Sequence, residues 1–184
     1  LTINSTSGDT GETEILAGTT LNAATINITA TTGNSDALNI VSSTLDASGN
    51  LTINSSCSGG TGDNDGLYLN AATLTADGTL TVNATATADG EGLQLETGTA
   101  VTAATVILNA TVGATGSEAL VLNGTSTVTA TGAAGVTVTT QGSAGNGVTL
   151  NASSLLRATT GPVTVECLRP IVLNTGDIKS DGVG

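Results

Sequence analysis

The sequence predicts an all-β fold, a right-handed parallel β-solenoid (β-helix) of about seven coils with three short strands in each. A strand-like phrase recurs along the chain, and apolar residues occupy every second position within each copy. Leu51-Thr52-Ile53-Asn54 returns as Leu80-Thr81-Val82-Asn83 and as Val106-Ile107-Leu108-Asn109. Looser copies begin at Leu1, Ile26, Val136 and Val163. Over all seven copies, successive starts are 25, 25, 29, 26, 30 and 27 residues apart. Such a period is typical of a solenoid, in which each turn of chain buries its apolar face against its neighbours.

The composition limits how a core can be built. The 184 residues include one Tyr and no Phe, Trp, Met or His. Because aromatic side chains supply much of the buried area in an ordinary core, we expect a thin column of Leu, Ile, Val and Ala instead. Polar low-complexity sequences are often disordered, but the in-phase apolar repeat and a charged fraction of only 10% favour a folded rod.

Three short strands fit each period, and each has its own inward positions. The first strand contributes the pairs Leu1/Ile3, Ile26/Ile28, Leu51/Ile53, Leu80/Val82, Val106/Leu108, Val136/Val138 and Val163/Val165. The second contributes Leu38/Ile40, Leu67/Leu69, Leu93/Leu95, Leu120/Leu122, Val148/Leu150 and Ile171/Leu173, with Glu14/Leu16 in that position of the opening coil. The third contributes one residue per coil, namely Leu21, Leu45, Leu74, Val101, Val128, Leu155 and Ile178. Gly, Asn and Asp fill the corners, and the right-handed sense is the general rule for parallel crossovers.

Asparagine is a second regularity of the repeats. It follows the last inward residue of the first strand at Asn4, Asn54, Asn83 and Asn109, and of the second strand at Asn70, Asn123, Asn151 and Asn174. Asn tolerates left-handed backbone angles and bonds locally to the backbone. We therefore expect stacked asparagines to form hydrogen-bonded ladders down the corners of the rod.

The acidic residues also align. Five of them lie two residues before the first inward position of the second strand, and two more lie a further two residues upstream. The five are Glu12, Asp36, Asp65, Glu91 and Glu118, and the two are Asp63 and Asp89. Like charges stacked at strand spacing repel, so either solvent screens them or a hard cation such as Ca²⁺ bridges them. Both interpretations, a solvated edge without a cofactor and a Ca²⁺-binding edge, remain open.

The phrases Gly49-Asn50-Leu51-Thr52-Ile53-Asn54 and Ala76-Asp77-Gly78-Thr79-Leu80-Thr81-Val82-Asn83 resemble the repeats of large bacterial surface exoproteins. The most similar family is that of the filamentous-haemagglutinin-like adhesins and autotransporter passenger domains. The resemblance implies secretion to the cell exterior and a role as a stalk or adhesive fibre. It also implies a host-surface or polysaccharide receptor as a partner.

One solenoid domain covers residues 1–184, and the chain does not begin with Met. We expect it to be a segment of a longer repeat protein, covered at its ends by further repeats or by end-to-end copies of itself. The net charge of −12 argues against nucleic acid and anionic membrane surfaces as partners. The sequence also contains no apolar stretch long enough to span a bilayer.

The sequence gives weaker support to other functions. Outward Thr residues align, among them Thr2, Thr52 and Thr81, which makes ice binding an alternative, although Ile107 and Glu166 interrupt the array. A polysaccharide-acting enzyme is opposed by the absence of His, the usual general base, and by a basic complement of only three residues, Arg157, Arg169 and Lys179. Cys57 and Cys167 lie four coils apart on inward positions, too far for an intrachain disulfide. The sequence thus predicts a non-catalytic structural segment, with a ligand-binding solenoid or a self-stacking filament subunit as alternatives.

Overall fold

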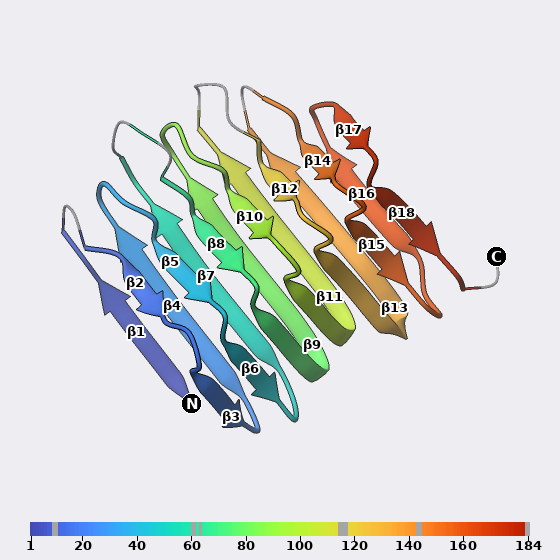
Figure 1. The fold of residues 1–184 in the computed structure, drawn as a ribbon, viewed down its shortest axis with the longest axis horizontal. Helices are drawn as coiled ribbons and strands as arrows, with labels where there is room; N and C mark the ends of the chain where they lie inside the picture. The colour runs from blue at the N-terminus through green and yellow to red at the C-terminus, as the bar shows by residue number, and fades with distance from the viewer. Residues whose placement is uncertain (9–10, 60–61, 63, 114–117, 143–144, 183–184) are drawn as a thin grey trace.

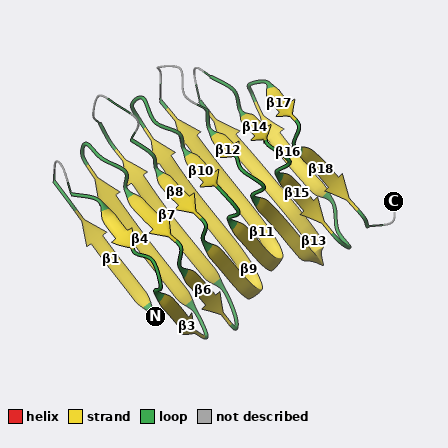
Figure 2. Ribbon diagram, viewed as in Figure 1, coloured by secondary structure: helices red, strands yellow, loops and turns green. Residues whose placement is uncertain are grey.

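The computed structural model describes residues 1–8, 11–59, 62, 64–113, 118–142 and 145–182. Over these residues the protein consists of strands and loops without a helix (Figure 2). The strands pair in parallel and stack as a β-solenoid of about six turns, so the predicted fold class is confirmed and the predicted seven coils are close.

Two sheets run the length of the stack. The 7-stranded sheet contains β2 (Thr13–Ile15), β5 (Leu38–Val41), β8 (Leu67–Asn70), β10 (Leu93–Glu96), β12 (Leu120–Leu122), β14 (Val148–Asn151) and β17 (Ile171–Asn174). The 11-stranded sheet contains β1 (Thr2–Thr6), β3 (Thr20–Ala23), β4 (Ile26–Thr32), β6 (Thr44–Ala47), β7 (Leu51–Cys57), β9 (Thr73–Ala86), β11 (Ala100–Val112), β13 (Thr127–Gln141), β15 (Leu155–Ala158), β16 (Val163–Cys167) and β18 (Asp177–Ser180). Figure 1 shows the coils side by side, with β1 and the N-terminus at one end and β17 and β18 at the other.

The predicted third strand merges with the first strand of the next coil in the middle of the rod. The merged strands β9, β11 and β13 are 14, 13 and 15 residues long, and each bends sharply in Figure 1. The pairing register shifts between Ala103 and Thr105, where β11 has one residue opposite two in β9 and four in β13. Inserted residues are therefore absorbed as bulges within long strands, not only at the corners between short ones.

The core is the aliphatic column that the alternation predicts. The inward pairs of the first strand are buried from Ile26 to Val138, and those of the second strand from Leu38 to Leu150. In β6, β9, β11 and β13 the third-strand segment buries two residues, because an alanine lies two positions after the predicted inward residue, as Ala47 lies after Leu45. These alanines were not predicted to face inward, because a small side chain in a Thr- and Ala-rich segment gives a weak apolar signal.

Two register predictions at the ends of the stack are wrong. In the opening coil Ile15 pairs with Ile40 and is buried, whereas Leu16 is 55% exposed, so the inward pair is Thr13/Ile15. In β15 the inward residue is Leu156, which pairs with Val128 and is fully buried. Leu155 faces outward in part. In both places two apolar residues are adjacent, so alternation alone does not decide which one faces inward.

Candidate functional site

Four acids stand in one file along the corner that precedes the 7-stranded sheet, and we call this file the acidic edge. Backbone hydrogen bonds set its register, since Ala37 donates to the Asp65 carbonyl, Gly66 to that of Glu91 and Gly92 to that of Glu118, at 2.9, 2.9 and 3.3 Å. The acidic edge therefore contains Asp36, Asp65, Glu91 and Glu118, and Asn146 continues it.

Glu12 was predicted to be part of this file, and that prediction is wrong. Thr13 pairs with Leu38, so Glu12 lies beside Ala37 and one residue out of step with Asp36. The exposed Glu12 side chain accepts a hydrogen bond from the Asn39 amide at 3.1 Å. A hydrogen bond to Glu14, burial, and the charges of Glu14 and Asp36 together raise the pKa of Glu12.

The carboxylates of the acidic edge bond to the next coil. The Asp65 backbone N–H donates to Asp36 Oδ1, and the Glu91 backbone N–H donates to Asp65 Oδ1, both at 2.8 Å. Asn146 Nδ2 donates to Glu118 Oε1 at 3.2 Å. These acids therefore join successive coils by accepting hydrogen bonds from N–H groups of the next coil.

Asp65 is the unusual member of the acidic edge because it is 3% exposed. Burial raises the pKa of Asp65 to about 9, and the hydrogen bond to Glu91 and the charge of Glu91 act in the same direction. At neutral pH Asp65 therefore carries a proton that it shares with the Glu91 carboxylate. A protonated carboxyl relieves the repulsion expected between stacked like charges.

One of the other predicted metal ligands, Asp89, lies off this file. Asp89 is exposed at the corner before β10, and Asp63 lies outside the described residues. Among the residues that the structure describes, no three Asp, Glu, Cys or His side chains gather where they could hold a metal ion. Asp36 and Asp65 already each accept a backbone hydrogen bond, so Ca²⁺ at the acidic edge would have to replace the shared proton of Asp65.

The asparagines form two hydrogen-bonded chains. On the outward face of the 11-stranded sheet, Asn109 donates to Asn83 and Asn83 to Asn54, each at 2.8 Å. This ladder lies within β7, β9 and β11 rather than at a corner between strands. Neighbouring coils are thereby tied by side chains as well as by the backbone.

The second ladder follows the end of the 7-stranded sheet. Asn174 donates to Asn151 and Asn151 to Asn123, both at 2.8 Å, and Asn123 donates to the Glu96 carboxylate. Asn70 was predicted to belong here but instead donates to the Tyr68 hydroxyl at 3.1 Å. The reason is its register, because its partners in the adjacent coils are Val41 and Glu96.

The left-handed backbone at these corners falls one residue after the asparagine. Ala71 follows Asn70 with φ 51°, and Ala152 follows Asn151 with the same value. Asn therefore contributes its side-chain hydrogen bonds, and the strained angle belongs to the next residue.

A column of buried hydroxyls, which the repeat pattern was not used to predict, lies beside the third strand. These residues precede the third strand directly and lie two positions before its first inward residue; they are Ser43, Thr99, Ser126 and Ser154. Ser43 donates to the Leu16 carbonyl at 2.6 Å and Thr99 to that of Leu69 at 3.1 Å. The signal was available in the sequence as a Ser or Thr at a fixed offset in the repeat.

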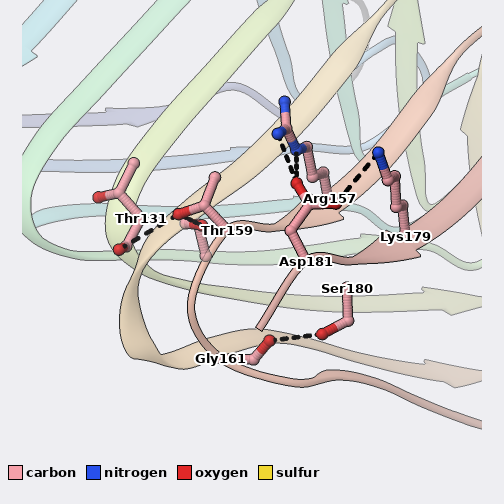
Figure 3. Close-up of polar contacts among 8 residues, drawn as sticks. Thr131, Arg157, Thr159, Gly161, Lys179, Ser180 and Asp181 are labelled. Atoms are coloured by element: carbon pink, nitrogen blue, oxygen red, sulfur yellow. Dashed lines mark hydrogen bonds and ion pairs between the residues drawn. The ribbon is translucent and has the colours of Figure 1, made fainter. Parts of the chain in front are cut away.

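The three basic residues lie in the last two coils. Arg157 and Lys179 both pair with Asp181, as Figure 3 shows, and these cations lower the pKa of Asp181. Arg169 is exposed on the loop between β16 and β17. In the same region Thr159 and Ser180 donate to carbonyls of neighbouring coils, so the polar groups again serve coil-to-coil bonding.

Described residues line at least two hollows on the surface. A groove of about 200 Å³ lies against Thr and Asn side chains of β4, β7 and β9, which include Thr29, Asn54 and Asn83. An open depression of about 480 Å³ lies near the C-terminal end and is lined by Glu166, Cys167 and Leu168, among others. The buried Cys57 and the half-buried Cys167 are both free thiols.

Among the described residues, no helix is long and apolar enough to cross a membrane. Comparison with known proteins gives no matching family model, no matching curated protein and no matching solved structure. The fold and the arrangement of its polar side chains are therefore the basis on which a function is proposed.

Proposed function

We propose that this chain is a structural, non-catalytic segment of an extracellular surface fibre or adhesin. The observation that carries the proposal is that polar side chains of the repeats form hydrogen bonds to adjacent coils. The Asn ladders, the acidic edge and the hydroxyls of Ser43, Thr99 and Ser154 each bond to an adjacent coil, whereas the buried Ser126 hydroxyl has no hydrogen-bond partner among the described residues. Such bonds along the rod axis resist separation of the coils, which is the mechanical requirement of a stalk.

Extracellular placement is supported by the resemblance of the repeat phrases to those of bacterial surface exoproteins. A non-catalytic role is supported by the chemistry of the charged groups. The chain has no His, and two of its three cations are paired with Asp181. A hydrolase acting on polysaccharide would need an acid and a base converging on one cleft.

A Ca²⁺-stabilised rod is the second candidate. The file of carboxylates at strand spacing favours it, because Ca²⁺ prefers several carboxylate and carbonyl oxygens. Calcium binding to the folded rod alone would raise its melting temperature by mass action.

The structural role is tested by unfolding kinetics together with adhesion. The chain, diluted to nanomolar concentration, is unfolded in guanidinium, and its rate is compared with that of Asn83→Ala, which breaks the ladder of β7, β9 and β11. Slow unfolding that the variant accelerates is expected. Beads coated with the native chain should also bind epithelial cell layers or immobilised polysaccharides more than beads coated with heat-unfolded chain. Rapid unfolding unaffected by the variant, together with equal bead binding, would overturn the proposal.

A further inference from the structure

We propose that the groove on the outward face of β4, β7 and β9 binds a neutral, extended polysaccharide, and that the side-chain amide of Asn54 donates a hydrogen bond to it. This inference rests on the proposed function and deepens it, because it names the chemical class of the receptor and the surface that would hold it. Its basis is the position of the groove, its lining, the open end of the Asn ladder and the distribution of charge.

The groove lies inside the stack of coils. β4 pairs with β1 on one side and β9 pairs with β11 on the other, so further coils flank these three strands in both directions (Figure 1). The groove therefore does not depend on what precedes or follows the chain. Its volume of about 200 Å³ is below the roughly 300–1,000 Å³ of pockets that enclose a small ligand. A groove of this size suits part of a long chain that passes over it.

The outward side chains that line the groove are all uncharged and polar. The pairing register arranges them in two columns that cross the three strands. The columns are Thr29, Asn54 and Asn83, and Thr31, Ser56 and Thr85. Each of these residues is half-buried although it faces solvent. Hydroxyls and amides both donate and accept hydrogen bonds, so the lining matches a ligand whose own groups do the same.

The Asn ladder of the 11-stranded sheet ends in this groove. Asn109 donates to Asn83 and Asn83 to Asn54, each at 2.8 Å, so the donations run in one direction. Because Asn54 Oδ1 faces Asn83, Asn54 Nδ2 on the other side of the same amide faces β4. There the column changes to Thr29, and among the described residues Asn54 Nδ2 has no hydrogen-bond partner. Hydrogen bonds in a chain polarise one another, which strengthens the donor at the end.

The second ladder ends differently. Asn174 donates to Asn151 and Asn151 to Asn123, and Asn123 donates to the Glu96 carboxylate. The terminal donor of that ladder is therefore satisfied within the chain. The terminal donor at Asn54 is instead left open at the wall of a groove, where a hydroxyl or ring oxygen of a ligand would accept it.

The outward columns that contain the groove carry no charge from β1 to β13. The positions opposite the lining residues in β1, β11 and β13, and the column that begins at Thr2, hold Thr, Asn and Gln, with Ile107 as the one apolar residue. The first charge in these columns is Glu166 in β16. A cationic ligand would find no counter-ion here, and the net charge of −12 would repel an anionic one. The groove therefore favours an uncharged ligand.

Repetition along the rod favours a polymer with a matching repeat. Adjacent coils place equivalent side chains about 4.8 Å apart, which is close to the rise per sugar of an extended β-1,4-linked glycan. Such a chain lying along the columns would meet a hydroxyl or an amide at each sugar, while the methyl groups of Thr29, Thr31 and Thr85 contact its C–H faces. A flat ice surface fits less well, because the face is hollowed and the Asn amides are bonded to one another.

NMR titration with neutral β-1,4-linked hexasaccharides tests the groove, with cellohexaose, mannohexaose and xylohexaose as the probes. We expect the native chain to bind at least one of them with a dissociation constant below about 1 mM. Two control ligands should bind at least about tenfold more weakly. They are maltohexaose, which has the glucose units of cellohexaose in an α-linked coil, and the anionic hexagalacturonate.

Asn54→Asp is the decisive variant. Its carboxylate keeps an oxygen that accepts the Asn83 amide, so the ladder is retained, but an acceptor replaces the open donor. We expect hexasaccharide binding to weaken at least about tenfold. The matched control Asn27→Asp adds the same charge to the exposed face of β4 outside the groove, and binding should change by less than about twofold. Thr31→Val/Ser56→Ala removes two hydroxyls of the lining without touching the ladder; it should weaken binding at least about fivefold, and it tests the groove if Asn54→Asp does not fold.

Binding of none of the three hexasaccharides, or equal binding by the native chain and the groove variants, would overturn the inference. Shaping of ice crystals by the native chain that Asn54→Asp abolishes would also overturn it, because the face would then be assigned to ice. Adhesion of coated beads is measured separately from hexasaccharide binding. Beads coated with Asn54→Asp that adhere as well as native beads would therefore refute the groove as the receptor site and leave the proposed function standing.

Discussion

Replacing Asp65 by Asn removes a buried carboxyl group that must bind a proton when the rod folds at neutral pH. Burial and Glu91 raise the pKa of Asp65 from 3.8 to about 9, so the folded chain holds a proton at pH 7 that the unfolded chain has lost. The stabilising contribution of this group is fully present below pH 3.8. It is lost progressively as the pH rises towards 9.

The size of this effect follows from the same two values. Between the unfolded-state pKa of Asp65 and pH 7, the contribution of this group to the free energy of unfolding falls by about 1.36 kcal/mol per pH unit, or roughly 4 kcal/mol in total. An Asn side chain keeps an acceptor for the Glu91 backbone N–H and offers a donor to the Glu91 carboxylate without binding a proton. We therefore expect Asp65→Asn to be more stable than the wild type at pH 7 by about 2–4 kcal/mol, and about equally stable at pH 3.5.

The assay is urea unfolding at pH values from 3.5 to 9, with the difference between variant and wild type as the measured quantity. Asp46→Asn is the matched control, because Asp46 is exposed on β6 and its replacement should change stability by less than about 0.5 kcal/mol. If Asp65→Asn destabilises the rod at pH 7, or if the difference does not grow between pH 4 and pH 8, then Asp65 is ionised in the fold and the reasoning fails.

Three further predictions concern the ladders, the core and calcium. Asn83→Ala removes the hydrogen bonds to both Asn54 and Asn109 and should lower the free energy of unfolding, measured in urea, by about 2 kcal/mol. The control Asn27→Ala, on the exposed face of β4, should lower it by less than about 0.5 kcal/mol. Equal losses in the two variants would refute the contribution of the ladder. Leu156→Ala should cost about 2–5 kcal/mol and Leu155→Ala distinctly less, because only Leu156 is fully buried; a reversed order would contradict the register of β15. The melting temperature in 5 mM Ca²⁺ should match that in excess chelator within about 1 °C, because the carboxylates already hold amides and a proton; a large rise would instead place a cation at the acidic edge.

The sequence predicted the rod most accurately where apolar and polar residues alternate without interruption. At Leu67/Leu69 or Leu93/Leu95 only one phase is apolar, so the inward face is unambiguous. At Leu155 both phases are apolar, and the choice of Leu156 is made by pairing with Val128 in the preceding coil. Such a choice depends on tertiary contacts and is not encoded in the local pattern.

The acidic edge shows the same limit for a polar feature. Fixed offsets in the repeat were enough to place Asp36, Asp65, Glu91 and Glu118 in one file. They did not reveal that Asp65 is buried while Asp89, two residues before Glu91, is exposed. Burial decides whether stacked carboxylates are screened by water or must share a proton, and burial depends on how the corner packs.

The proton of Asp65 also matters for how the whole rod holds together. In a solenoid each coil contacts only its neighbours, so stability is approximately a sum of coil and interface terms. Asp65 lies at one such interface, since it binds the backbone N–H of Glu91 in the next coil and its own N–H binds Asp36 in the preceding coil. Ionisation of Asp65 would therefore weaken the stack at one place rather than uniformly. We expect the protection factors from amide hydrogen exchange, which are corrected for the intrinsic rise of exchange with pH, to fall first in β8 and β10 at alkaline pH, while those of β14 around Asn151 are retained. An equal fall of the protection factors along the rod would show that the coils unfold as one cooperative unit.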